Sequence, residues 1–148
     1  MANTVVIDGL PKMDPERKAE WVAALRSGNY KQGHEWLNRG GAMCCLGVAC
    51  DLHSKSPEGM KWTSKSGFDG PTTYGYDGQV AYPPDDVLKW LGFDIADLRT
   101  HFKTQEELRQ KLAMPTNTTG MAHYVFANLN DNQKWTFEQI ADFIEANF

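Results

Sequence analysis

Two adjacent cysteines, Cys44 and Cys45, are the residues in this sequence best suited to covalent chemistry. They open an apolar segment, 43–50, for which the sequence predicts a buried helix. A thiol at the start of a helix has its thiolate stabilised by the helix dipole, which is one way in which nucleophilic cysteines are activated. The pair therefore raises the hypothesis of a cysteine hydrolase or transferase.

The spacing Cys45-x-Gly47 resembles the nucleophile segment of NlpC/P60-type peptidases, in which Cys-Ser-Gly opens the central helix. That resemblance implies a histidine base, and His123 is the only candidate with apolar neighbours. His123, however, falls in a segment predicted to be helical, and no polar residue is placed to orient it. The competing interpretation is that the thiols are small core residues, inert because desolvation raises their pKa. We favour this second interpretation and expect no catalytic residue.

Metal and phosphate motifs are weak. Cys50-x-x-His53 offers two zinc ligands, but a tetrahedral site needs a second pair at comparable spacing, and the sequence has none. His34 and His101 stand among dissimilar neighbours. Because no glycine-rich loop ends in Lys followed by Ser or Thr, Walker-type nucleotide hydrolysis is excluded. We therefore expect neither a metal ion nor a cofactor.

The remaining chemistry lies in aromatic and polar side chains that suit a binding pocket. Aromatic rings of the mid-chain segment can stack a base, a cationic or amide group near residue 30 can meet phosphates, and an Asn-Asp pair can bind ribose hydroxyls. The set that we assign to ligand binding comprises Arg26, Lys31, Gln32, His34, Trp62, Tyr74, Tyr76, Asn130 and Asp131. The alternative is that these aromatic side chains cover a small core.

Three helices must position these groups. Asp14 can cap a helix with Pro15 in its first turn, and Ser27-Gly28 ends it. The apolar segment after Cys44 predicts a second helix that runs to about residue 53, because a segment apolar on all sides belongs in the interior. The third, 137–148, starts from a Thr136 capping box and places its apolar residues on one face.

The rest of the chain predicts shorter elements. Residues 54–82 suggest loops and short strands, 85–91 a short helix, 104–113 a capped helix, and 121–129 another helix. Residues 130–132 suggest the turn into the last helix. The predicted fold is α+β, a compact single domain over 1–148 with four to six short helices and a small antiparallel sheet.

Composition and charge narrow the function classes. The 148 residues hold 19 acidic and 15 basic side chains, a net charge of -4, and no basic run exceeds two residues. Polymeric nucleic acid is therefore an unfavourable partner, because affinity for it comes from neutralised phosphates. No apolar run approaches the roughly 20 residues of a membrane helix, and no secretory signal opens the chain. Three cysteines, an odd number, favour reduced thiols in a cytoplasmic compartment.

Several motifs together resemble a family of small proteins from tailed bacteriophages. They are Leu25-Arg26-Ser27-Gly28-x-Tyr30, then Cys44-Cys45-Leu46-Gly47-Val48, Trp90-Leu91-Gly92, Leu129-Asn130-Asp131 and Ile140-Ala141-Asp142. The resemblance covers most of the chain, except residues 63–79. It implies a phage protein made in the cytoplasm of a bacterial host, and it implies no activity.

The favoured hypothesis is a catalytically silent binding protein. In that hypothesis the protein sequesters a small nucleotide-derived ligand, such as an immune signal, and so counters bacterial defence. We expect such a protein to form a homo-oligomer. Two alternatives stay open: a cysteine hydrolase or transferase that uses Cys44 or Cys45, and an inhibitor that binds a host protein.

Overall fold

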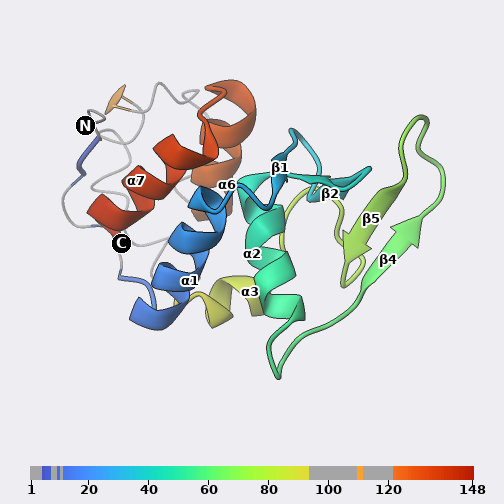
Figure 1. The fold of residues 1–148 in the computed structure, drawn as a ribbon, viewed down its shortest axis with the longest axis horizontal. Coiled ribbons are helices and arrows are strands. Elements are labelled where there is room, and N and C mark those ends of the chain that lie inside the picture. Colours follow the sequence, from blue (N-terminus) through green and yellow to red (C-terminus); the bar gives the residue numbers. More distant parts are fainter. Residues whose placement is uncertain (1–4, 8–9, 11, 94–109, 112–121) are drawn as a thin grey trace.

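The fold was taken from a computed structural model, which describes residues 5–7, 10, 12–93, 110–111 and 122–148. The chain runs α1 (Pro15–Arg26), β1 (Lys31–Gln32), β2 (Asn38–Arg39), β3 (Ala42–Met43), α2 (Cys45–Ser54), β4 (Trp62–Lys65), β5 (Thr73–Tyr76), α3 (Asp85–Trp90), α6 (Ala122–Ala127), the π-helix η2 (Asn128–Asn132) and α7 (Phe137–Asn147). The predicted α+β class is confirmed. The helices gather on one side, and the β4–β5 hairpin extends away from them (Figure 1).

The sheet is mixed rather than purely antiparallel. Its strand order is β1-β3-β2-β5-β4, with β1 parallel to β3 and the other neighbours antiparallel. β2 and β3 form a tight hairpin across Gly40 and Gly41, whose φ values of 62° and 86° are in the left-handed region that glycine adopts without steric cost. The parallel pair arises because the chain returns from this hairpin alongside β1.

The helix boundaries follow local capping signals. Asp14 accepts hydrogen bonds from the backbone N–H groups of Glu16 and Arg17, so α1 begins where the sequence predicts. Thr136 and Gln139 form the predicted capping box at the start of α7. The helix predicted over 104–113 lies outside the described residues, apart from 110–111, which are helical.

The core lies between α1, α2, α6 and α7. Trp21 of α1 is fully buried, donates its indole N–H to the carbonyl oxygen of Cys45 at 3.0 Å, and packs edge-on against Phe126 of α6. Phe126 in turn contacts Phe143 of α7. These aromatic contacts join helices that are distant in sequence, and Figure 1 shows α1 and α7 lying side by side.

Candidate functional site

All three cysteines lie in the interior, as the favoured interpretation of the sequence predicts. Cys44 caps α2, and its sulfur accepts a hydrogen bond from the backbone N–H of Gly47 at 3.4 Å. Burial raises the pKa of Cys44 to about 12 and raises the pKa values of Cys45 and Cys50 well above the usual thiol range. The helix dipole therefore does not produce a thiolate here. His123 belongs to α6, and its side chain lies outside the described part of the chain.

We expect iodoacetamide to leave Cys44, Cys45 and Cys50 unmodified in the folded protein at neutral pH, since raised pKa values and burial both suppress reaction. Mass spectrometry after timed labelling measures the number of adducts. All three thiols should react after urea denaturation. A Ser66→Cys variant, with its new thiol on the exposed loop between β4 and β5, is the matched positive control. Rapid native labelling of one of the three natural cysteines would revive the nucleophile hypothesis.

The aromatic residues assigned to stacking divide between the core and the sheet. Tyr76 is fully buried, and its hydroxyl oxygen accepts from the backbone N–H of Met60 and lies 2.5 Å from Nδ1 of His53. Trp62 packs on Tyr76 at 5.1 Å and donates its indole N–H to Asp51. Tyr74 is half-buried in β5. Trp62 and Tyr76 therefore attach the β4–β5 hairpin to α2, as the alternative interpretation held.

Asp51, which sequence reasoning missed, anchors this attachment. Its carboxylate accepts from the hydroxyl of Tyr30 at 2.6 Å, from the indole of Trp62 at 3.1 Å and from the ammonium of Lys55 at 3.0 Å. Three donors leave little of the carboxylate free for a ligand. The spacing of Asp51 and Lys55, one helical turn apart, was the only local signal.

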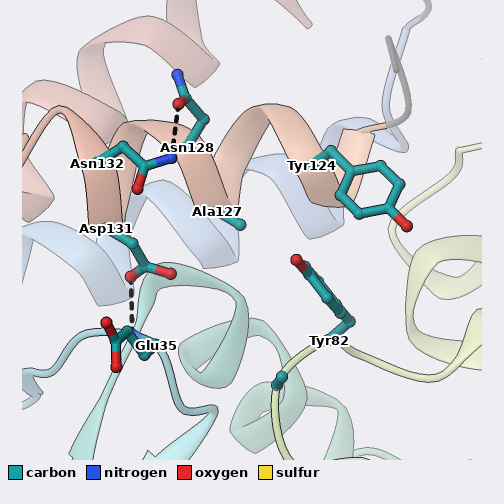
Figure 2. Close-up of a pocket in the computed structure, with 8 residues that line it drawn as sticks. Glu35, Tyr82, Tyr124, Ala127, Asn128, Asp131 and Asn132 are labelled. Carbon is teal, nitrogen blue, oxygen red and sulfur yellow. Dashed lines mark hydrogen bonds between the residues drawn. The ribbon is translucent and has the colours of Figure 1, made fainter. Parts of the chain in front are cut away.

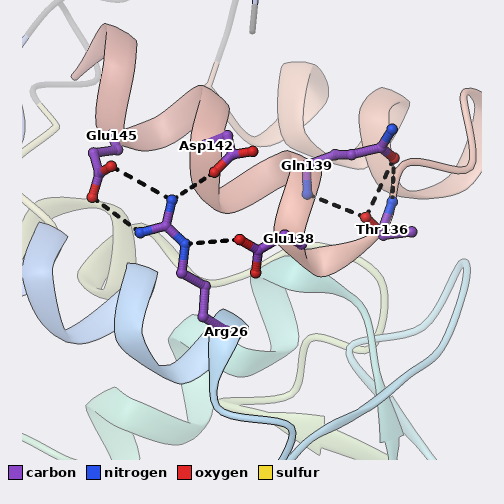
Figure 3. Close-up of polar contacts among 6 residues, drawn as sticks. All are labelled: Arg26, Thr136, Glu138, Gln139, Asp142 and Glu145. Carbon is purple, nitrogen blue, oxygen red and sulfur yellow. Dashed lines mark hydrogen bonds and ion pairs between the residues drawn. The ribbon is translucent and has the colours of Figure 1, made fainter. Parts of the chain in front are cut away.

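Arg26 is committed to the helix body rather than to a phosphate. Its guanidinium lies 2.6 Å from Asp142, 3.1 Å from Glu145 and 3.4 Å from Glu138, all on α7 (Figure 3). Hydrogen bonds to Glu145 and then Asp142 raise its pKa further above the usual arginine value. A cation already held by three carboxylates offers little attraction to an added anion. The structure therefore does not support the assignment of Arg26 to ligand binding.

Replacing Arg26 by Gln should lower the free energy of unfolding by about 1 kcal/mol at low salt, because exposed ion pairs each contribute little even within a network. The loss should shrink in 1 M salt, where charges are screened. Urea unfolding at both salt concentrations measures it. Arg26→Lys, which keeps the charge but not the planar fork, should lose only part of this stability. An unfolding midpoint unchanged by Arg26→Gln at low salt would show that the network contributes nothing.

Asn130 and Gln32 form a polar link within the protein. Asn130 is fully buried, and its carbonyl oxygen accepts from Nε2 of Gln32 at 2.9 Å and from the backbone N–H of Cys45 at 3.2 Å. Its amide donates to the carbonyl oxygen of Gly33 and to Asp131. Lys31 and His34, in contrast, are exposed beside this link. Of the predicted ligand residues, only Asp131 lies on the pocket described next.

A polar pocket of about 320 Å³ lies between the 33–36 turn, the segment before α3, and the junction of α6 with η2. The two acidic residues and the two tyrosines that line it come from different parts of the chain (Figure 2). The described residues that line it are Glu35, Ala81, Tyr82, Tyr124, Ala127, Asn128, Asp131 and Asn132. This volume is at the lower end of the range for small-molecule sites, roughly 300–1,000 Å³.

Two uncommon backbone conformations meet at this pocket. Residues Asn128–Asn132 form a π-helix, a rare element that is often found at functional sites. Glu35 has a φ of 72°, in the left-handed region that side chains other than glycine rarely adopt. The two are joined directly, because Oδ1 of Asp131 accepts from the backbone N–H of Glu35 at 2.9 Å. The side chain of Asp131 therefore links the π-helix to the strained backbone at Glu35.

The carboxylate of Asp131 has one oxygen committed and one available. Oδ1 also accepts from the amide of Asn130 at 2.7 Å, whereas Oδ2 has no hydrogen-bond partner among the described residues. Figure 2 shows Oδ2 on the side that faces Tyr82. Burial first, and then the neighbouring Tyr124 and Asp131, raise the pKa of Tyr82. The pocket thus combines a preorganised acceptor with a phenol that stays protonated at neutral pH.

Sequence reasoning found Asp131 but missed Glu35, Tyr82 and Tyr124. Tyr82 and Tyr124 pack edge-on at 5.3 Å although they are far apart in sequence. No local spacing connects residues 35, 82 and 124, so no motif could have grouped them. The only local hint of the pocket was the position of Glu35, which directly precedes the aromatic Trp36 in an irregular segment that also contains Gly33.

The structure is that of an α+β protein with a polar, tyrosine-walled pocket and three buried thiols. The chain belongs to the family described as Domain of unknown function (DUF8296), whose model matches residues 13–148. Neither the curated proteins nor the solved structures contain a significant match to it. Within the described residues, no helix has the length and apolar character needed to cross a bilayer.

Proposed function

We propose that the protein is a catalytically silent binding protein that sequesters a small nucleotide-derived ligand in the Asp131 pocket. The observation that carries the proposal is the Asp131 carboxylate, with Oδ1 fixed by backbone and amide donors and Oδ2 on the side that faces Tyr82 in a half-open pocket. Such a preorganised acceptor suits a hydroxyl or amino donor. Because the thiols are buried and protonated, the same structure gives no support to covalent chemistry.

The ligand contacts follow from the groups on the wall. A ribose hydroxyl can donate to Oδ2 of Asp131, which lies on the side that faces Tyr82. Tyr82 is 41% exposed, and its ring is the group that we propose to stack on a base, an interaction worth roughly 1–3 kcal/mol. These contacts replace the earlier assignment of stacking to Trp62 and Tyr76, which are engaged with α2.

The biological role that we propose is capture of a nucleotide-derived immune signal, in support of a phage against bacterial defence. The sequence resemblance to small phage proteins supports this role, together with a pocket that has the size of a single nucleoside. We also propose a homo-oligomer, which native mass spectrometry of the purified chain can test. A role as an inhibitor of a host protein is a separate hypothesis that no feature of the pocket favours.

The test is to incubate the protein with pooled bacterial nucleotides and nucleosides, remove unbound compounds, denature the protein and analyse the released compounds by mass spectrometry. Recovery of an intact compound supports sequestration, and recovery of a cleaved product supports an enzyme instead. Tyr82→Ala should lose retention. Phe68→Ala removes an equally exposed aromatic ring from the hairpin loop and should retain the ligand. Absence of any retained compound would contradict the proposal.

A further inference from the structure

We infer that the pocket accepts the uncharged nucleoside part of its ligand and rejects a phosphate group. This inference rests on the proposed function, because it specifies which part of a nucleotide-derived ligand enters the Asp131 pocket. Two acidic residues, Glu35 and Asp131, line the pocket, and none of the eight lining residues that the structure describes is basic. Among these eight residues, no cation offsets the negative charge.

The charge on the wall has a definite consequence for binding. When a charge on the ligand lies about 4 Å from a protein charge of the same sign, their repulsion lowers the affinity roughly fivefold even at the dielectric constant of water. The loss of affinity is larger in a partly enclosed site. A phosphate dianion inside the pocket would be repelled by the charges of both acidic residues that line it. The cation that sequence reasoning assigned to phosphate, Arg26, is held by carboxylates of α7.

The hydrogen-bonding groups on the wall point to the same class of ligand. A carboxylate accepts hydrogen bonds and cannot donate them, so Oδ2 of Asp131 requires a donor on the ligand. The vicinal hydroxyls of a ribose and the amino group of a base are donors, whereas the phosphate oxygens of a nucleotide are acceptors. Charge and hydrogen-bond direction therefore select the nucleoside and exclude its phosphate.

The size of the pocket sets a limit as well. A volume of about 320 Å³ is close to the smallest that accommodates a drug-sized ligand, roughly 300 Å³. One nucleoside fills such a space, and a dinucleotide exceeds it. A larger nucleotide-derived ligand must therefore keep its phosphates and any second nucleoside outside the pocket.

Calorimetric titration with matched pairs tests the inference: adenosine, guanosine, cytidine and uridine, each against its 5′-monophosphate. We expect at least one nucleoside to bind and its monophosphate to bind at least about tenfold more weakly at low salt. The difference should narrow in 0.5 M salt, because the repulsion is screened. Asp131→Asn keeps an acceptor at Oδ1 for the Glu35 backbone N–H, and Glu35→Gln keeps the side-chain length. Each should reduce the discrimination against the monophosphate several-fold.

The matched control is Glu58→Gln, which removes one exposed acidic charge beyond the C-terminal end of α2, whereas the pocket adjoins the N-terminal end. It should leave the discrimination unchanged. A monophosphate that binds as tightly as its nucleoside, or more tightly, overturns this inference and leaves the proposed function standing. The inference is also overturned if neither Asp131→Asn nor Glu35→Gln changes the ratio of the nucleoside and monophosphate affinities. If neither a nucleoside nor a monophosphate binds, the proposed function fails, and the inference fails with it.

Discussion

Replacing Gly47 by alanine is expected to destabilise the protein by at least about 4 kcal/mol, a large part of the 5–15 kcal/mol typical of a domain. A Cβ atom at residue 47 would lie 1.9 Å from the carbonyl oxygen of Leu37 and 3.1 Å from Cβ of Met43. The carbonyl cannot easily retreat, because Leu37 is fully buried and its N–H is hydrogen-bonded to Val80. Helix α2 would have to separate from the strand segment that covers it.

Urea unfolding followed by tryptophan fluorescence measures this loss, and little or no folded Gly47→Ala protein in the soluble fraction would be the extreme form of it. Gly28→Ala is the matched control. Gly28 has a φ of 78° with nothing within 4 Å of the added Cβ, so only the left-handed conformation is penalised, by about 1–2 kcal/mol. Equal stabilities of the two variants would refute the close packing of α2 described above.

Asn130→Ala is expected to lower the free energy of unfolding by about 3 kcal/mol. Four hydrogen bonds disappear with the side chain, and the backbone N–H of Cys45 and the amide of Gln32 each lose a buried acceptor. Because Asn130 also binds Asp131, the substitution should weaken ligand binding at the pocket. Urea unfolding and calorimetric titration give the two measurements.

The control for this second substitution is Asn29→Ala, which removes the same group from an exposed position after α1. A surface change of this kind should alter stability by less than about 0.5 kcal/mol. If Asn130→Ala were equally mild, the polar link between η2, the 32–33 segment and α2 would contribute nothing to stability. If calorimetric titration also showed unchanged ligand binding, a role of Asn130 in shaping the pocket would be excluded.

The sequence alone predicted the elements whose signals are local. The caps at Asp14 and Thr136 defined the starts of α1 and α7, and the uniformly apolar segment after Cys44 correctly predicted a buried helix. The α+β class followed from these elements together with the glycine-rich, aromatic segment that became β4 and β5. Each of these predictions depended on side chains within a few residues of one another.

Features that depend on distant pairing could not be predicted in this way. Arg26 has the same appearance in a sequence whether it binds a phosphate or three carboxylates more than 110 residues away. Tyr76 has the appearance of a stacking residue, and its burial depends on His53 and Met60. The parallel β1–β3 pairing and the π-helix also lack a recognisable local signature in the sequence.

The pairing of α1 with α7 has a consequence for how the protein is made. Arg26 and Glu145 are 119 residues apart, so α1 leaves the ribosome long before its partner helix exists. At about 5–20 residues per second, the apolar face of Trp21, Val22 and Leu25 stays uncovered by α7 for roughly 6–24 seconds. A nascent chain in that interval offers a binding surface to chaperones until α7 has been made.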